Sequence, residues 1–444
     1  MERLAEHPPN VLPLRGEVKG SFAYVTVKDR LPVILTKAID TLTRTLHAET
    51  AGYPAEKTAE AKDCISQLSK LTYELQRDRP LDVLRDSEED VETWNFLLGV
   101  VAKDKKTWFS APWLFVECYM YRKIREIFSR TKYWKDFDVF ATQQKEPALF
   151  GSLKSVEELG KHLDDVELSL TNELERKAIL REFLQFSLWG NQTDLSLLVN
   201  VTHADIHAMQ TTSAGSLAKV EEKIIVNDLE KVLERLESIN RGRVDIILDN
   251  AGFELLADLC FADWLVHSGT AAKVVFHAKA FPWFVSDTTQ RDFNWTLDAV
   301  ENHARATDNA ILLHRLEKWR ALLADGTWEV KVDPFWTLPY PFWQLPTAGK
   351  YLYEYLCGSD FLIFKGDLNY RKAVYDAEWP VTTPFREALG PIANDKTPPL
   401  LLLRTCKSDV AVGLKPGQAE QLTAEDKGWM VNGKFGMIQY HASS

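Results

Sequence analysis

The sequence predicts an α/β protein: a Rossmann-like, mostly parallel sheet with helices on both faces, preceded by an N-terminal α-helical domain. Up to about residue 181, apolar side chains recur at three- and four-residue intervals, the period of amphipathic helices. After about residue 240, short aliphatic runs alternate with helical segments, as in doubly wound folds. These runs show little polar alternation, which is typical of strands buried on both faces.

The change of pattern divides the chain into three parts. We expect a flexible N-terminus over residues 1–18, a helical domain over 19–185 and an α/β domain over 186–444. At 444 residues the chain is long enough for several such units and a large core.

The helical domain is predicted from its amphipathic segments. "LPVILTKAIDTLTRTL" carries Pro32 in its first turn, where proline is tolerated. "APWLFVECYMYRKIREIF" is expected to be the most buried helix of the domain. Its Glu117 and Tyr121 lie four residues apart, so they either face a site or satisfy one another at a helix surface or domain interface.

The α/β domain is predicted from six aliphatic runs and the helical segments between them. The expected strands are 244–249, 272–278, 328–332, 360–366, 399–405 and 435–442, the last at an edge of the sheet. The expected helices are 253–269, 289–305, 348–359 and 370–377.

Composition excludes several classes of protein. The net charge of -11 and pI near 5.5 argue against a nucleic-acid or anionic-membrane binder, which needs a basic surface. The chain shows no signal-peptide core and no run of about 18 apolar residues. Its five cysteines include no CxxC pair and are expected to be reduced. We therefore expect a soluble cytoplasmic protein, with nuclear entry left open.

Polar side chains follow the first two of these predicted strands. Asp249 and Asn250 end the first, Glu254 lies one turn into the next helix, and Asp287 follows the second strand. Ligands of such sheets bind beyond the carboxyl ends of the strands, and carboxylate and amide oxygens suit Mg²⁺ or Mn²⁺. Taken singly, an Asp at such a junction is most often a helix N-cap.

The later strand ends carry a polar, partly cationic set that suits phosphate and sugar hydroxyls: Asp367, Asn369, Arg371, Arg404 and Lys407. Singly, Arg371 and Lys407 would be solvated surface charges. The convergence of four strand ends favours a site.

A polar stretch at 197–216 lacks a firm period and reads as a loop. His203 and His207 have helical i,i+4 spacing, but "HADIH" lacks the glutamate of a zinc protease motif, so we do not expect a zinc site.

The stretches "DNAGFEL", "PWFVSDTT", "FKGDLNYRK" and "RTCK" resemble the metal-dependent damage-control phosphatases, and "RTCK" is similar to the "RTxK" element of their third subfamily. That subfamily comprises sugar-phosphate phosphatases also described as protein-glutamate methyltransferases. The likeness extends through "SLWGNQTDLS" to "GSFAYVTVKDRLP", so it covers most of the chain.

The resemblance implies a divalent metal, Mn²⁺, Mg²⁺, Co²⁺ or Ni²⁺, held by Asp249, Asn250 and Asp287. It also implies substrate contacts within 367–371, Tyr370 among them, and at Lys407. Asn191 is a further candidate, as part of a lid or hinge.

We therefore expect a metal-dependent phosphatase that hydrolyses small sugar phosphates, such as fructose 1-phosphate and fructose 6-phosphate, by metal-activated water attack. Either Asp249 or Glu254 orients or deprotonates the water. An aspartyl-phosphate route is disfavoured because Ala251 stands where a second acid would be needed. The alternative is an S-adenosylmethionine-dependent methyltransferase acting on a protein glutamate, although "DNAGFE" supplies only one glycine.

Overall fold

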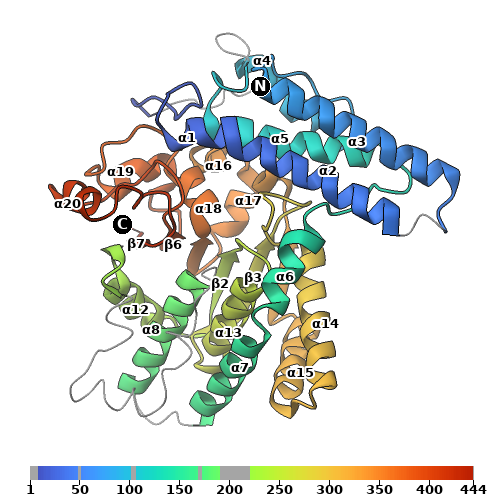
Figure 1. Cartoon of the computed structure of the whole chain (residues 1–444). Coiled ribbons are helices and arrows are strands. Elements are labelled where there is room, and N and C mark those ends of the chain that lie inside the picture. The colour runs from blue at the N-terminus through green and yellow to red at the C-terminus, as the bar shows by residue number, and fades with distance from the viewer. Residues whose placement is uncertain (1–8, 49–51, 102–106, 169–172, 191–220, 444) are drawn as a thin grey trace.

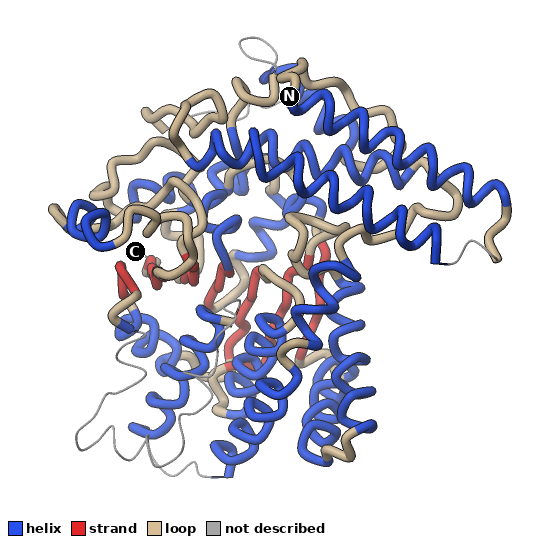
Figure 2. The backbone as a smooth tube through the Cα atoms, in the orientation of Figure 1, coloured by secondary structure: helices blue, strands red, loops and turns tan. Residues whose placement is uncertain are grey.

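The computed structural model describes residues 9–48, 52–101, 107–168, 173–190 and 221–443. Its centre is a seven-stranded sheet with helices on both faces, which confirms the predicted fold class (Figures 1 and 2). The strands follow the order β1-β7-β6-β5-β2-β3-β4, and every neighbouring pair is parallel except β6 with β7. The strands are β1 (Ile224–Asn227), β2 (Gly242–Ile247), β3 (Ala271–Ala278), β4 (Trp328–Val332), β5 (Phe361–Lys365), β6 (Leu400–Thr405) and β7 (Gly436–His441).

The edge of the sheet differs from the prediction. β7 was expected at the edge, but it lies second, because β1 pairs with it through Ile224 and Gly436. The four residues of β1 are too short a run to separate from the helix after it. Helix α18 (Gly366–Ala373) also begins four residues before the predicted segment, directly after β5.

Successive residues of the central strands enter opposite cores. In β5, Phe361 and Ile363 join one apolar cluster, whereas Leu362 and Phe364 join the other. Both faces are therefore covered, as the continuous hydrophobic pattern predicts. The first cluster is covered by α7 (Leu153–Leu168), α8 (Glu173–Trp189), α12 (Leu229–Ser238), α13 (Phe253–His267), α14 (Gln290–Ala306) and α15 (Ala310–Ala324). Elements of the second include η3 (Pro334–Thr337), η4 (Phe342–Gln344), α16 (Leu345–Ala348), α17 (Lys350–Leu356), α18, α19 (Phe385–Leu389), η5 (Gly390–Ile392) and α20 (Gln418–Glu425).

The N-terminal helices lie across one end of the sheet, above β2 and β3 in the view of Figure 1. We call this unit the cap. It comprises α1 (Phe22–Val25), the π-helical turn η1 (Thr26–Arg30), α2 (Leu31–Ala48), α3 (Ala55–Gln76), α4 (Val91–Val101) and α5 (Trp113–Ser129). As predicted, α5 is buried along most of its length. The cap shares an apolar cluster with the second face of the sheet.

Between cap and sheet lie η2 (Ala141–Lys145) and α6 (Glu146–Phe150). The predicted helical domain extends to residue 185, yet α7 and α8 share the apolar cluster of α13. Between Phe140 and Leu149 the chain thus passes from the cluster that the cap shares to the cluster on the other face of the sheet. No helix among the described residues is long and apolar enough to cross a membrane.

Candidate active site

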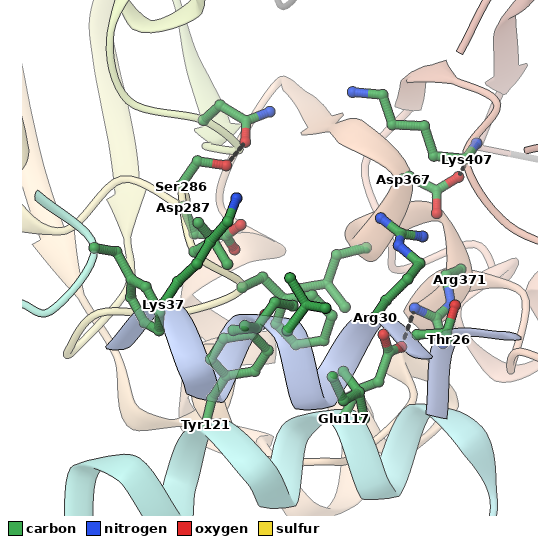
Figure 3. Close-up of a pocket in the computed structure, with 18 of the residues that line it drawn as sticks. Thr26, Arg30, Lys37, Glu117, Tyr121, Ser286, Asp287, Asp367, Arg371 and Lys407 are labelled. Atoms are coloured by element: carbon green, nitrogen blue, oxygen red, sulfur yellow. Dashed lines mark hydrogen bonds and ion pairs between the residues drawn. The ribbon is translucent and has the colours of Figure 1, made fainter. Parts of the chain in front are cut away.

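A cavity of about 620 Å³ lies between the cap and the carboxyl ends of the strands (Figure 3). Its volume is in the range of small-molecule sites. One wall comes from strand ends and carries Asp249, Asn250 and Asp287. The opposite wall comes from η1, α2 and α5. The cavity therefore exists only where the two halves of the chain meet.

The acidic wall is built by two loops that pair with each other. β2 ends at Ile247, and two residues later the Asp249 carbonyl accepts a hydrogen bond from Thr288 N at 2.7 Å. Asn250 and Asp287 form an antiparallel bridge. These backbone bonds hold the three candidate ligands at one edge of the sheet, as the sequence predicts.

The amide of Asn250 is fixed in one orientation. Its Nδ2 donates to Asp249 Oδ2 at 2.7 Å and to Glu254 Oε2 at 2.8 Å, while its Oδ1 accepts from the Ser286 hydroxyl. The amide oxygen therefore points away from the two acids.

The loop before Asp287 is strained. Phe284 and Val285 have φ of 42° and 70°, in a region that costs energy for residues with a Cβ and most for β-branched ones. The loop is held by Asp287 N donating to Trp283 O at 3.1 Å and by stacking of Phe284 on Tyr121. Ser286 and Asp287, which directly follow this strained pair, line the cavity.

The neighbouring carboxylates of Asp249, Glu254 and Asp287 repel one another. Burial, and then the charges of Glu254 and Asp287, raise the pKa of Asp249 well above its usual value. Burial also raises the pKa of Asp287, although Lys279 Nζ lies 3.2 Å from its Oδ2. That oxygen is buried and accepts no hydrogen bond among the described groups. Burial therefore disfavours the charged forms of both Asp249 and Asp287.

These residues fit a divalent cation with oxygen ligands. In the described ranges no group of three or more His, Cys, Asp or Glu side chains has the arrangement of a metal site. Two carboxylates and one amide are a donor set that Mg²⁺ or Mn²⁺ completes with water and substrate oxygens. Asp249 and Asp287 are both buried with raised pKa values, and a divalent cation would stabilise their charged forms.

Three rim residues line the cavity, and they differ in how far their side chains are engaged by protein partners. Lys407 is partly exposed, and its Nζ has no ion pair within the described chain. Arg371 is buried, and its guanidinium is shared between Glu117 Oε2 at 2.6 Å and Asp376 Oδ1 at 2.8 Å. Asp367 accepts from Arg404 Nε at 2.8 Å and from Lys407 N at 3.1 Å. Lys407 is therefore the rim cation that remains available to an anion.

Four predicted site residues lie behind the cavity wall. Asn369 Nδ2 donates to Lys365 O at 2.7 Å, and Tyr370 is fully buried. Arg404 donates to Asp367 and to the Val410 carbonyl at 2.6 Å. Glu254 accepts from Asn250 and, at 3.0 Å, from Lys365 Nζ. None of the four lines the cavity, so their contacts position the residues that do.

The other residues considered in the sequence analysis lie outside the described residues or in the core. Asn191, His203, His207 and the 197–216 loop lie outside the described residues. Cys406 is buried, and burial raises the pKa of its thiol to about 11, which fits a core residue rather than a nucleophile.

The cationic side chains of the cap that line the cavity were not identified in the sequence analysis. Arg30 and Lys37 line the cavity from η1 and α2, and Figure 3 shows both side chains reaching upward from the cap. Their spacing of seven residues places them on one helix face. That spacing indicates a shared helix face, but it gave no reason to expect Arg30 and Lys37 near the strand ends. The π-helical turn at Arg30 is a feature often found at functional sites.

Comparisons with known proteins cover most of the chain. The family described as the damage-control phosphatase ARMT1-like domain matches residues 26–422. "Damage-control phosphatase ARMT1" of Danio rerio is 38% identical over 99% of this chain and 98% of its own length. The proteins of that name in Rattus norvegicus and Homo sapiens are 40% and 38% identical, each over 96% of this chain and 98% of its own length.

A crystal structure of a DUF89 family protein from Pyrococcus horikoshii is 12% identical, with a TM-score of 0.37, over 77% of this chain and 88% of that one. The family match and the relatives' identity span nearly the entire sequence, so the predicted resemblance is confirmed. The chain belongs to the damage-control phosphatase ARMT1-like family.

Proposed function

We propose that this protein is a metal-dependent phosphatase that hydrolyses phosphate monoesters of small polar metabolites. The observation that carries the proposal is one cavity with Asp249, Asn250 and Asp287 on its wall and the unpaired Lys407 on its rim. Paired oxygen ligands and a free cation are the groups that bind and neutralise a phosphoryl group. The names of the family and of the relatives support it.

The residues of the cavity divide metal binding and phosphate binding between them. Asp249, Asn250 and Asp287 would hold the divalent metal, and when bound it lowers the pKa of water and neutralises phosphoryl charge. Lys407 would contact a phosphoryl oxygen through its uncommitted ammonium group. Arg371 contributes less directly, because its guanidinium is already bound by Glu117 and Asp376.

The position of Glu254 favours Asp249 as the group that orients the attacking water. Both oxygens of Glu254 are occupied, one by Asn250 and one by Lys365, and the side chain does not line the cavity. Asp249 lines it. Ala251 stands in place of a second acid, which supports attack by water over an aspartyl-phosphate intermediate.

Fructose 1-phosphate and fructose 6-phosphate are the substrates we propose to test first. Metal-stripped protein would be assayed for phosphate release, with Mg²⁺, Mn²⁺, Co²⁺ or Ni²⁺ added back, beside Asp287→Asn. We expect at least one metal to restore turnover in the wild type and none in the variant. Absence of release with every metal, from folded protein, would overturn the proposal. S-adenosylmethionine binding would then be measured as the test of methyl transfer.

A further inference from the structure

We infer that Tyr121 and Glu117, on helix α5 of the cap, form a subsite that binds hydroxyl groups on the alcohol part of the substrate. The inference rests on the proposed phosphatase function and extends it to substrate selection. Tyr121 and Glu117 lie one helical turn apart and line the cavity on the wall opposite the acids, where Figure 3 shows both on the same helix.

The hydroxyl group of Tyr121 is available to a ligand. The residue is 3% exposed, yet its hydroxyl makes no hydrogen bond with any described group. The ring is held by stacking on Phe284, with centroids 4.8 Å apart and planes inclined by 26°, and by contact with Trp283 and Phe140. A fixed ring with a free hydroxyl is a preorganised hydrogen-bonding group.

Glu117 offers one oxygen to the same part of the cavity. Its Oε2 accepts from Arg371 at 2.6 Å, and its Oε1 accepts no hydrogen bond from the described residues. Because Arg371 is also bound by Asp376, Glu117 cannot rotate freely. The carboxylate therefore presents a fixed acceptor one helical turn from Tyr121, whose hydroxyl can donate or accept.

A third polar atom on the cap wall also lacks a protein partner. Thr26 lines the cavity from η1, is 2% exposed, and its hydroxyl has no hydrogen bond among described groups. Arg30, on the same turn, is close enough to act electrostatically on both Glu117 and Tyr121. The cap thus lines the cavity with donors and acceptors that the described protein groups leave unpaired.

Polar groups without a protein partner discriminate strongly between substrates. A site built to hydrogen-bond a substrate hydroxyl rejects the analogue that lacks it, because the protein groups are then left unpaired. The matching ligand is a phosphate ester whose alcohol carries at least two hydroxyl groups. An apolar alcohol would leave Tyr121 and Glu117 without partners.

The test compares wild type with Tyr121→Phe, which removes one oxygen and keeps the stacking on Phe284. Fructose 1-phosphate supplies hydroxyl groups, and phenyl phosphate has none. We expect the ratio of kcat/KM for fructose 1-phosphate to that for phenyl phosphate to fall about 3- to 10-fold, the effect of one neutral hydrogen bond. Tyr351→Phe is the matched control, since Tyr351 is 87% exposed and outside the cavity, and should leave the ratio unchanged.

Glu117→Gln tests the acceptor, because glutamine can still accept from Arg371. We expect a larger fall in the same ratio, about 10-fold or more, as for a charged acceptor. An equal loss of activity on both compounds, or an unchanged ratio in both variants, would overturn the subsite.

A binding measurement distinguishes failure of the proposed phosphatase function from failure of the subsite. If wild-type protein hydrolyses neither compound, binding of fructose 1-phosphate is measured by calorimetry. Weaker binding to Tyr121→Phe than to Tyr351→Phe then supports the subsite, and equal binding overturns it.

Discussion

A Cβ atom on Gly366 would lie 1.9 Å from Oδ2 of Asp249 and 2.1 Å from its Cγ. Gly366 also has φ of 84°, a conformation that favours glycine. The carboxylate of a candidate metal ligand is therefore placed against the bare backbone at the start of α18.

Substitution Gly366→Ala should displace the Asp249 side chain and strain the backbone. We expect loss of metal-dependent turnover, together with a decrease of more than about 1 kcal/mol in the free energy of unfolding. Urea denaturation and phosphate release measure the two effects. Gly269→Ala is a matched control: its φ is 79°, but no atom lies within 4 Å of the added Cβ, so it should lose stability and keep turnover.

Asp249→Asn should stabilise the metal-free protein. The pKa of Asp249 is raised in the folded state, so its favourable contribution is fully present below the unfolded pKa and is lost as pH rises through the folded value. A neutral amide removes the unfavourable transfer of this carboxyl group from water into the buried site. Thermal unfolding should show a higher metal-free Tm in the variant, and a gain on adding Mn²⁺ only in the wild type. A variant with a lower metal-free Tm would contradict this account.

Lys407→Gln should lower activity without lowering stability. Since Lys407 Nζ has no ion pair in the described chain, its loss should change the free energy of unfolding by less than about 0.5 kcal/mol. Loss of a cation on the phosphoryl group should reduce kcat/KM about 10²- to 10³-fold. Lys427→Gln, at an exposed position, is the control for a general effect of charge.

Arg371→Gln should mainly lower the free energy of unfolding, in contrast to Lys407→Gln, which should mainly lower activity. It leaves Glu117 and Asp376 buried without their cation, which costs about 3–5 kcal/mol in comparable cases. The double variant with Glu117→Gln should recover part of that loss, because one unpaired acid is also removed. Glu117→Gln alone completes the cycle, and a double variant whose loss equals the sum of the two single losses would show that the two residues are not coupled.

Lys372 should make the stability of the metal-free protein depend on pH. Burial lowers its pKa to about 8, and its Nζ donates to the Trp336 and Leu338 carbonyls. Between pH 8 and the unfolded pKa of 10.5, the unfolded chain binds more protons, so stability rises with pH by up to about 3 kcal/mol. Urea titrations at pH 7.5 and 10 should show this rise in the wild type and a smaller one in Lys372→Met.

The strand ends could be predicted because the pattern that defines them is local. Asp249 and Asn250 directly follow an aliphatic run, and in a parallel sheet the end of such a run fixes the position of the next residues along the chain. Helix α18 shows where this reasoning stops. Asp367 and Arg371 lie four residues apart on the cavity face, whereas Asn369 is turned toward the backbone of the sheet.

The cap wall could not be predicted in the same way. Arg30 is more than 200 residues from Asp249 in sequence, and only tertiary packing brings the two to one cavity. The amphipathic period identified α5 and its buried face, and it placed Glu117 and Tyr121 on one turn. It did not reveal that their partners would be Arg371 and Phe284.

The meeting of cap and sheet has a consequence for synthesis. Asp409 Oδ2 accepts from Ala23 N at 3.0 Å, so residues 386 positions apart meet near the cavity. Arg30 leaves the ribosome long before Lys407 is made, and contacts of such high sequence separation form late in folding. A nascent chain or a truncated fragment that lacks Lys407 therefore has no complete cavity.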